Sequence, residues 1–378
     1  MDRGTTMTTD LEITGYETQI LQIPERMIGD SQTHVFETEE LDYLYLEIET
    51  NTNVTGIGVD LVELRAPGQP SAKTLHSRVD DVLPDIIGKN PITLLNRQTR
   101  HRGGVHNYYS SGSYGTGVSV LMNMALWDAA AKYFEQPLHK FMGGTDDSVP
   151  IYASGLSFGN DNKRTREVYR NFTELGDFNA AKVKVGFETV DEDIDRITLV
   201  DDVFDGLETL MIDPNEAWTP KETIRKLRTF QDVGFDIFWV EDPIFRHDHE
   251  GMRRIIENTP DTHLTVGEYH GFEGKHGLLA ADAVDILNLQ GLSAASTAST
   301  LAQPTGTAVA MSTDHGTDAM SVQAGLALPD VRYIECCNHT LLELSEKPYI
   351  IEDGQVTATD KPGHGVEFSE DVLETHSR

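Results

Sequence analysis

Charged residues end a series of short apolar segments at almost equal intervals in the second half of the chain. The series runs through Lys184 in AAKVKVG, Asp213 in LMIDPN, Glu241 in FWVEDP and Glu268 in LTVGE, with successive intervals of 29, 28 and 27 residues. This interval matches one strand, one helix and their loops, which is the repeat of a parallel α/β barrel. Because such barrels gather the carboxyl ends of their strands at one face, we expect these side chains to lie together there.

Eight apolar segments with the composition of buried strands follow one another from residue 149 onwards. They cover 149–154, 180–186, 209–215, 237–243, 264–268, 283–290, 308–315 and 331–337. Amphipathic segments such as 220–234 lie between them. The rhythm predicts an α/β barrel domain over residues 149–345.

The first third of the chain has a different pattern. Segments 11–21, 41–50 and 57–64 are typical of an antiparallel meander, and we expect residues 23–38 to form a polar loop between the first two strands. Helices are predicted after the meander. The glycine-rich stretch before Pro150 indicates a domain boundary, so we expect an α+β capping domain over 1–148 and a segment 346–378 that packs on it.

The composition limits the classes of partner. The chain of 378 residues has 62 acidic and 30 basic residues, for a net charge of −32. Such a charge repels nucleic acid and anionic membranes, and its even spread suits a solvated, halophilic surface rather than an interaction tail. The sequence shows no signal peptide or membrane-spanning run, and its two cysteines are adjacent, which disfavours a disulfide framework. We therefore expect a cytoplasmic enzyme that forms a homo-oligomer.

Three carboxylates, those of Asp213, Glu241 and Glu268, are predicted to converge at the barrel mouth. Converging anions are tolerable around a cation, and hard oxygen ligands without cysteine suit Mg²⁺, or Mn²⁺, rather than zinc. Asn215 lies two residues beyond Asp213 on the same face, so we expect it over the metal, in contact with substrate. The alternative is three separate acids in helix caps or salt bridges.

Lys182 and Lys184 lie two residues apart on one strand and share a face. Two ammonium groups beside a metal repel each other's protons, so we expect the pKa of one to fall towards neutrality and to make it a general base. The alternative is that one or both point to solvent.

His315 ends the seventh strand, across the barrel from the two lysines. A base on each side of a substrate whose carboxylate is held by a metal is suited to removing the proton α to that carboxylate. The alternative for His315 is a loop or salt-bridge role. Glu335, at the end of the eighth strand, would donate a hydrogen bond to a developing oxyanion if it stays protonated.

Taken in order, these motifs resemble the mandelate racemase branch of the enolase superfamily. The matching residues are KVK at 182–184, DPNEAW at 213–218, VEDP at 240–243, GE at 267–268 and His315, together with the segment ALWDAAAKYFEQPLHKFMGG and the closing PGHGVEF. The resemblance implies a (β/α)7β TIM-like barrel under an α+β cap. It also implies Mg²⁺ on Asp213, Glu241 and Glu268, a base at Lys184 assisted by Lys182, and an acid or base at His315.

One position departs from the family pattern. The strand-seven histidine of this branch usually pairs with an aspartate at the end of strand six, where this chain has Gln290. Asp285 lies near the start of that strand and on the opposite face, so we interpret it as structural. We expect His315 to use Asp314 or Asp318 instead, and Gln290 to contact the substrate.

The motif DPNEAW resembles the corresponding motif of the acid-sugar dehydratases, which include glucarate dehydratase. We therefore expect a Mg²⁺-dependent hydro-lyase of sugar-acid catabolism, which forms a 2-keto-3-deoxy acid from an aldonate or aldarate. The alternatives are a racemase or epimerase using Lys184 and His315, a lactonising enzyme, and a barrel retained for binding without catalysis.

Overall fold

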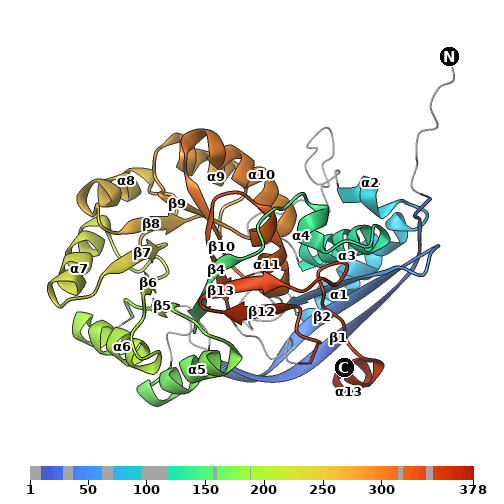
Figure 1. Ribbon diagram of the computed structural model, residues 1–378, viewed down its shortest axis with the longest axis horizontal. Coiled ribbons are helices and arrows are strands. Elements are labelled where there is room, and N and C mark those ends of the chain that lie inside the picture. The colour runs from blue at the N-terminus through green and yellow to red at the C-terminus, as the bar shows by residue number, and fades with distance from the viewer. Residues whose placement is uncertain are drawn as a thin grey trace.

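A closed barrel and a smaller cap make up the fold in the computed structural model (Figure 1). The structure describes residues 10–28, 37–61, 71–95, 117–155, 160–187, 189–313, 318–337 and 344–378. Within these residues no helix is long and apolar enough to span a membrane.

Eight parallel strands form the barrel in chain order, and the last strand pairs with the first. They are β4 (Val149–Ser154), β5 (Ala180–Lys184), β6 (Thr209–Asp213), β7 (Ile237–Glu241), β8 (His263–Val266), β9 (Ile286–Leu289), β10 (Ala308–Met311) and β11 (Val331–Cys336). The outer helices are α5 (Asn162–Leu175), α6 (Val190–Val203), α7 (Pro220–Asp232), α8 (His249–Asn258), α9 (Phe272–Ala280), α10 (Leu292–Ala302) and α11 (Asp318–Ala327). The predicted barrel and its eight strands are confirmed.

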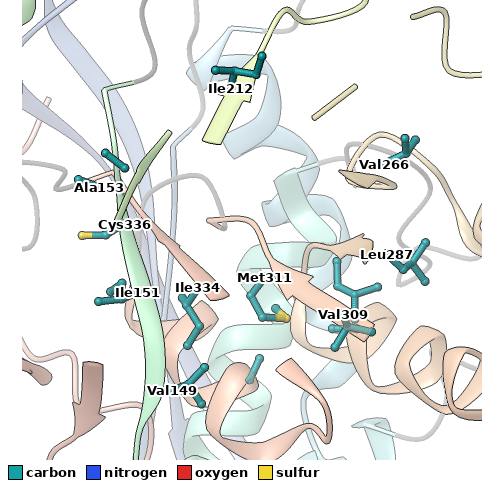
Figure 2. Packing of buried hydrophobic residues seen from close by; sticks show 14 of the residues in the cluster. Val149, Ile151, Ala153, Ile212, Val266, Leu287, Val309, Met311, Ile334 and Cys336 are labelled. Carbon is teal, nitrogen blue, oxygen red and sulfur yellow. The ribbon is translucent and has the colours of Figure 1, made fainter. Parts of the chain in front are cut away.

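Strand alternation divides the barrel side chains into two layers. One layer faces the helices, and Figure 2 shows part of it, with Ile151, Ile334 and Met311 from three neighbouring strands. The other layer fills the barrel interior with a separate aromatic cluster that includes Tyr152 and Trp239, whose rings lie 5.3 Å apart. Residues that share the parity of this second layer therefore point into the barrel.

The cap consists of an antiparallel meander covered by helices. Its strands are β1 (Ile13–Ile28), β2 (Glu37–Thr50) and β3 (Thr55–Leu61), and its helices are α1 (Ala72–Val82), η1 (Leu83–Ile86), α2 (Pro91–Leu95), α3 (Gly117–Tyr133) and α4 (Leu138–Phe141). Helix α3 packs on β3 at Gly58, where an added Cβ would lie 2.1 Å from the Leu121 carbonyl oxygen.

The predicted loop at 23–38 is wrong at both ends. Strand β1 continues to Ile28 and β2 already begins at Glu37, with a register shift between Pro24 and Met27. Continued pairing of β1 with β2 holds residues 23–28 and 37–38 in extended backbone although the sequence shows no periodicity there. The remaining part of that loop, 29–36, lies outside the described residues.

The C-terminal segment contacts both parts of the molecule. Its hairpin, β12 (Tyr349–Glu352) and β13 (Gln355–Ala358), pairs antiparallel with β4 of the barrel. Helix α13 (Glu370–His376) lies next to β1 of the cap, and the Arg378 amide donates to the Ile20 carbonyl at 3.0 Å (Figure 1). The division of the chain at residues 148 and 345 stays a prediction.

His364 is a fully buried connection between this segment and the cap. Its Nε2–H donates to the Ile57 carbonyl at 2.8 Å, and its Nδ1 accepts from the Val366 amide at 3.1 Å. Its own amide donates to Asp128 of α3 at 2.9 Å, and Asp128 also accepts from the Ile57 amide at 3.0 Å. These contacts require the neutral imidazole, because a second ring proton would remove the acceptor at Nδ1.

We predict that acidification destabilises the protein through His364. Burial lowers the pKa of His364 below its ordinary value of 6.5, so the unfolded state takes up a proton at a pH where the folded state does not. The stability that this neutral histidine contributes is present above pH 6.5 and is lost as the pH falls towards the folded pKa. Urea unfolding of wild type and His364→Gln, between pH 7.5 and 5.5, should show a shallower pH dependence in the variant.

The same substitution should cost about 1–3 kcal/mol at pH 7.5, because it leaves buried backbone groups without partners. The exposed His276 provides the control, since His276→Gln should keep the wild-type dependence. An unchanged slope in His364→Gln would show that this histidine does not contribute to the pH dependence.

Candidate active site

The predicted site residues meet at the carboxyl ends of the barrel strands. Lys182 and Lys184 come from β5, Asp213 from β6, Glu241 from β7 and Glu335 from β11, and all five are buried. Each has the parity of the aromatic interior layer, so strand alternation points each side chain into the barrel. The expectation that the lysines point inward is therefore confirmed.

Lys182 lies at the centre of this group. Its Nζ is 2.9 Å from Glu241 Oε1, 2.8 Å from Glu335 Oε1 and 3.6 Å from Asp213 Oδ2. Below it, the Tyr152 ring centroid is 5.6 Å away. Burial alone would lower the pKa of Lys182, but Glu241 and Glu335 outweigh it and raise the pKa well above its ordinary value. The predicted fall in a lysine pKa is therefore wrong for Lys182, because its nearest neighbours are carboxylates.

Lys184 lies two residues beyond Lys182, at the carboxyl end of β5. Its Nζ donates to Asp213 Oδ2 at 2.5 Å and to Asn215 Oδ1 at 3.1 Å. The backbone N–H of Asn215 in turn donates to Asp213 Oδ1 at 2.8 Å. The Asn215 backbone is left-handed, with a φ of 44°. Asn215 thus lies beside the Asp213 carboxylate and the Lys184 amine, and its expected position over a metal stays a prediction.

Gly267 connects the end of β8 to Glu268, and its backbone conformation and close packing favour glycine at this position. Gly267 has a φ of 144°, and an added Cβ would lie 2.5 Å from the Asn288 carbonyl oxygen. Burial raises the pKa of Glu268, Lys182 partly offsets this, and Glu335 and Asp213 raise it further. Burial likewise raises the pKa of Glu241, with Lys182 opposing and Asp213 and Glu268 adding to the shift.

When ionised, the four carboxyl groups of the site carry more negative charge than its two lysines balance. These groups belong to Asp213, Glu241, Glu268 and Glu335. Glu241 Oε2 is buried and accepts no hydrogen bond from any described residue. Within the described ranges, no three His, Cys, Asp or Glu side chains are arranged closely enough to hold a metal ion, and lysine ammonium groups contact Asp213 and Glu241. An excess of hard oxygen donors with a free buried oxygen fits a divalent cation such as Mg²⁺.

Glu335 is held as a carboxylate. Burial would raise its pKa, but Lys182 and a hydrogen bond from the Thr313 amide, 3.1 Å from Oε2, bring the pKa to about 2. The condition under which Glu335 was expected to donate a proton to an oxyanion is thus not met. Glu335 instead connects Lys182, which contacts its Oε1, with the Thr313 backbone just after β10.

Gln290 also contacts the end of β10, through Nε2, which donates to the Thr313 carbonyl at 3.1 Å. His315 and Asp314 lie in 314–317, outside the described residues, so the expected pairing of His315 with Asp314 or Asp318 stays a prediction. The Thr313 hydroxyl donates to the buried Asp318 at 2.6 Å. Asp318 also accepts from the Cys337 amide at 3.2 Å, and these contacts hold the start of α11 against β11.

Asp285 has the structural role that its position indicated. One of its carboxylate oxygens accepts a hydrogen bond from the Leu264 amide at 2.8 Å, at the start of β8 and away from the strand ends.

Sequence reasoning did not assign a role to Asn288. Its Nδ2 donates to Glu241 Oε1 at 3.3 Å, so it helps to fix the carboxylate. The parity of residues 286, 288 and 290 was the signal that could have found it. Asp242 was also missed, and both of its buried oxygens accept no hydrogen bond within the described part of the chain.

Comparison with known families matches both parts of the chain. A model described as "Enolase C-terminal domain-like" matches residues 164–372, and one described as "Mandelate racemase / muconate lactonizing enzyme, N-terminal domain" matches residues 18–143. The chain belongs to the mandelate racemase/muconate lactonizing enzyme family. A solved structure from Mesorhizobium loti with a provisional mandelate racemase description is 32% identical, with a TM-score of 0.84 over 97% of this chain and 95% of the other.

Curated relatives in this family carry different activities. A 3,6-anhydro-α-L-galactonate cycloisomerase from Streptomyces coelicolor is 29% identical over 69% of this chain and 72% of its own length. An L-talarate/galactarate dehydratase from Salmonella typhimurium is 26% identical over 66% of this chain and 60% of its own length. Other relatives are named as epimerases, racemases and cycloisomerases. Membership of the family therefore establishes an enzyme without deciding between lyase and isomerase.

We predict that Lys182→Met destabilises the metal-free protein by about 3–5 kcal/mol, because it leaves buried carboxylates without their cation. Urea unfolding in the presence of a chelator measures this. Lys163→Met is the control, since Lys163 pairs with Glu167 at 3.8 Å on an exposed helix face and should change the free energy of unfolding by less than about 0.5 kcal/mol. Equal effects of the two substitutions would contradict the importance of the buried pairs.

Proposed function

We propose that the protein is a Mg²⁺-dependent dehydratase of a sugar acid. It removes the proton α to the substrate carboxylate and expels the β-hydroxyl, which gives a 2-keto-3-deoxy acid after tautomerisation. The observation that carries this proposal is the position of Lys184 Nζ, buried at the edge of the carboxylate group and held by Asp213 and Asn215. An amine placed beside a candidate cation site is suited to take an acidified carbon-bound proton.

Asp213, Glu241 and Glu268 would hold the ion. When bound, Mg²⁺ supplies positive charge that stabilises the substrate carboxylate as the proton leaves and that lowers the pKa of the neighbouring Lys184. Asn288 keeps Glu241 in place, and Asn215 fixes both Asp213 and Lys184.

The two lysines then have different tasks. Lys184 takes the α-proton. Lys182 keeps its charge, because Glu241 and Glu335 both contact its Nζ, and it supports the carboxylates from below. We expect His315, which follows β10 in the sequence, to protonate the leaving hydroxyl, which departs as water.

Relatives support a sugar acid as the substrate. The cycloisomerase and dehydratase described above, and a D-galactarolactone cycloisomerase from Agrobacterium fabrum, are all named for sugar acids or their derivatives. The acid-sugar motif DPNEAW and Asn215 beside the carboxylates favour a polar, hydroxylated substrate. β-Elimination needs such a hydroxyl next to the carbon that loses its proton, and racemisation does not.

Incubation with a panel of aldonic and aldaric acids in the presence of Mg²⁺ should build up a 2-keto acid, measured as its semicarbazone. The same mixtures, followed by NMR, report epimers and lactones. If only an epimer or a lactone forms across the panel, with no keto product, the chain is an isomerase and the dehydratase proposal is wrong.

Lys184→Ala should lower the rate of α-proton exchange with D₂O by at least about 10²-fold, because Lys182, the other amine on that strand, keeps its proton. His315→Asn should retain exchange and lose elimination, since it removes the acid for the leaving hydroxyl. Lys163→Ala is the control for loss of an amine elsewhere. Exchange that survives in Lys184→Ala and is lost in His315→Asn would reverse the two roles.

A further inference from the structure

Three successive loops at the carboxyl end of the barrel contain or directly follow the three proposed metal ligands. They comprise residues 214–219, which follow Asp213, residues 242–248, which follow Glu241, and residues 267–271, which contain Glu268 itself. Loops at the carboxyl end of a barrel are the most variable parts of the fold, so the relative position of three ligands depends on what holds their loops together.

Arg246, in the second loop, is bound to the first loop through Glu216. Its Nε donates to Glu216 Oε1 at 2.8 Å and its Nη2 to Oε2 at 2.6 Å, which forms a bidentate pair. The Arg246 amide also donates to Oε1 at 2.6 Å. Both side chains are about a quarter exposed, so solvent weakens the electrostatic part of this pair, while the fixed geometry of the fork remains.

The same arginine reaches the third loop on its other side. Its Cζ lies 4.2 Å from the centroid of the Tyr269 ring, a cation–π contact with the residue next to Glu268. Its carbonyl accepts a hydrogen bond from His270 Nε2 at 3.0 Å. Arg246 therefore touches all three loops with its guanidinium or its backbone.

Backbone contacts between the first two loops depend on unusual conformations. Glu216 and Asp242 have φ angles of 62° and 36°, in the left-handed region. The Glu216 amide donates to the Asp242 carbonyl at 2.6 Å, and the Trp218 amide donates to the Pro243 carbonyl at 3.0 Å. Left-handed backbone at a non-glycine residue costs free energy and persists where surrounding contacts determine it. The bidentate pair between Glu216 and Arg246 is such a contact.

We propose that Arg246 is a positioning residue that sets the spacing of Asp213, Glu241 and Glu268 by clamping their loops through Glu216, Tyr269 and His270. The inference rests on the proposed function, because it takes these three acids as metal ligands. Arg246 itself has no contact with the acids and takes no part in proton transfer.

The test measures Mn²⁺ binding to the full-length protein by EPR, without substrate. Arg246→Met should weaken the affinity by about 10–100-fold, the range for residues that support metal ligands. Arg246→Lys should recover little of this loss, since an ammonium group lacks the bidentate fork. Glu216→Gln breaks the same clamp from the other side and should weaken binding in the same direction.

Arg254→Met is the matched control. Arg254 lies on α8, eight residues further along, where it pairs with Glu250 at 3.4 Å in a largely exposed helix-face contact. Its substitution should leave the Mn²⁺ affinity unchanged. Circular dichroism of each metal-free variant checks that it is folded, and Glu216→Gln carries the test if Arg246→Met does not fold.

The outcomes separate the two proposals. Wild-type protein that binds no Mn²⁺ would overturn the metal assignment and this inference with it. Wild-type binding together with unchanged affinity in folded Arg246→Met or Glu216→Gln would overturn the clamp alone. A loss in both variants that spares Arg254→Met would support it.

Discussion

The balance of charge inside the barrel mouth is the constraint on which the rest of the site depends. Five carboxylates, those of Asp213, Glu241, Asp242, Glu268 and Glu335, gather there, and two ammonium groups lie among them. Uncompensated charge is costly in a poorly hydrated interior. The raised pKa values of Glu241, Asp242 and Glu268 express this cost. A bound divalent cation would relieve it, and the site is then stable in the form that the chemistry uses.

The barrel produces this concentration of charge through strand parity. Residues such as Lys182 and Glu241 share the inward face with Tyr152 and Trp239, one layer nearer the carboxyl ends of the strands. The aromatic layer fills the barrel beneath the charges, so under the proposed function a substrate would enter the site from the loop side. The cap and the C-terminal segment are joined to the barrel through buried polar contacts such as those of His364.

Much of this could be predicted from the sequence because it depends on short-range periodicity. The interval between Asp213, Glu241 and Glu268 and the alternation around Lys182 and Lys184 are local patterns, and they identified the barrel, the strand ends and the site. The contact of Lys182 with Glu335 leaves no local pattern, because it depends on closure of the barrel, which pairs β11 with β4, the neighbour of β5. The pairing of Arg246 with Glu216, thirty residues apart on different loops, leaves no periodic signal. The extension of β1 to Ile28 was missed because backbone pairing, rather than side-chain pattern, holds those residues in a strand.

The most direct test of this account is the effect of Mg²⁺ on the stability of the protein. A ligand that binds only the folded state at about 100 times its dissociation constant stabilises that state by about 2.7 kcal/mol. Wild-type protein titrated with Mg²⁺ at constant ionic strength should therefore gain stability towards urea, and Glu241→Gln, which removes one of the carboxylate charges, should gain much less. An unfolding midpoint that does not change with Mg²⁺ in the wild type would contradict the claim that the buried carboxylates form a cation site.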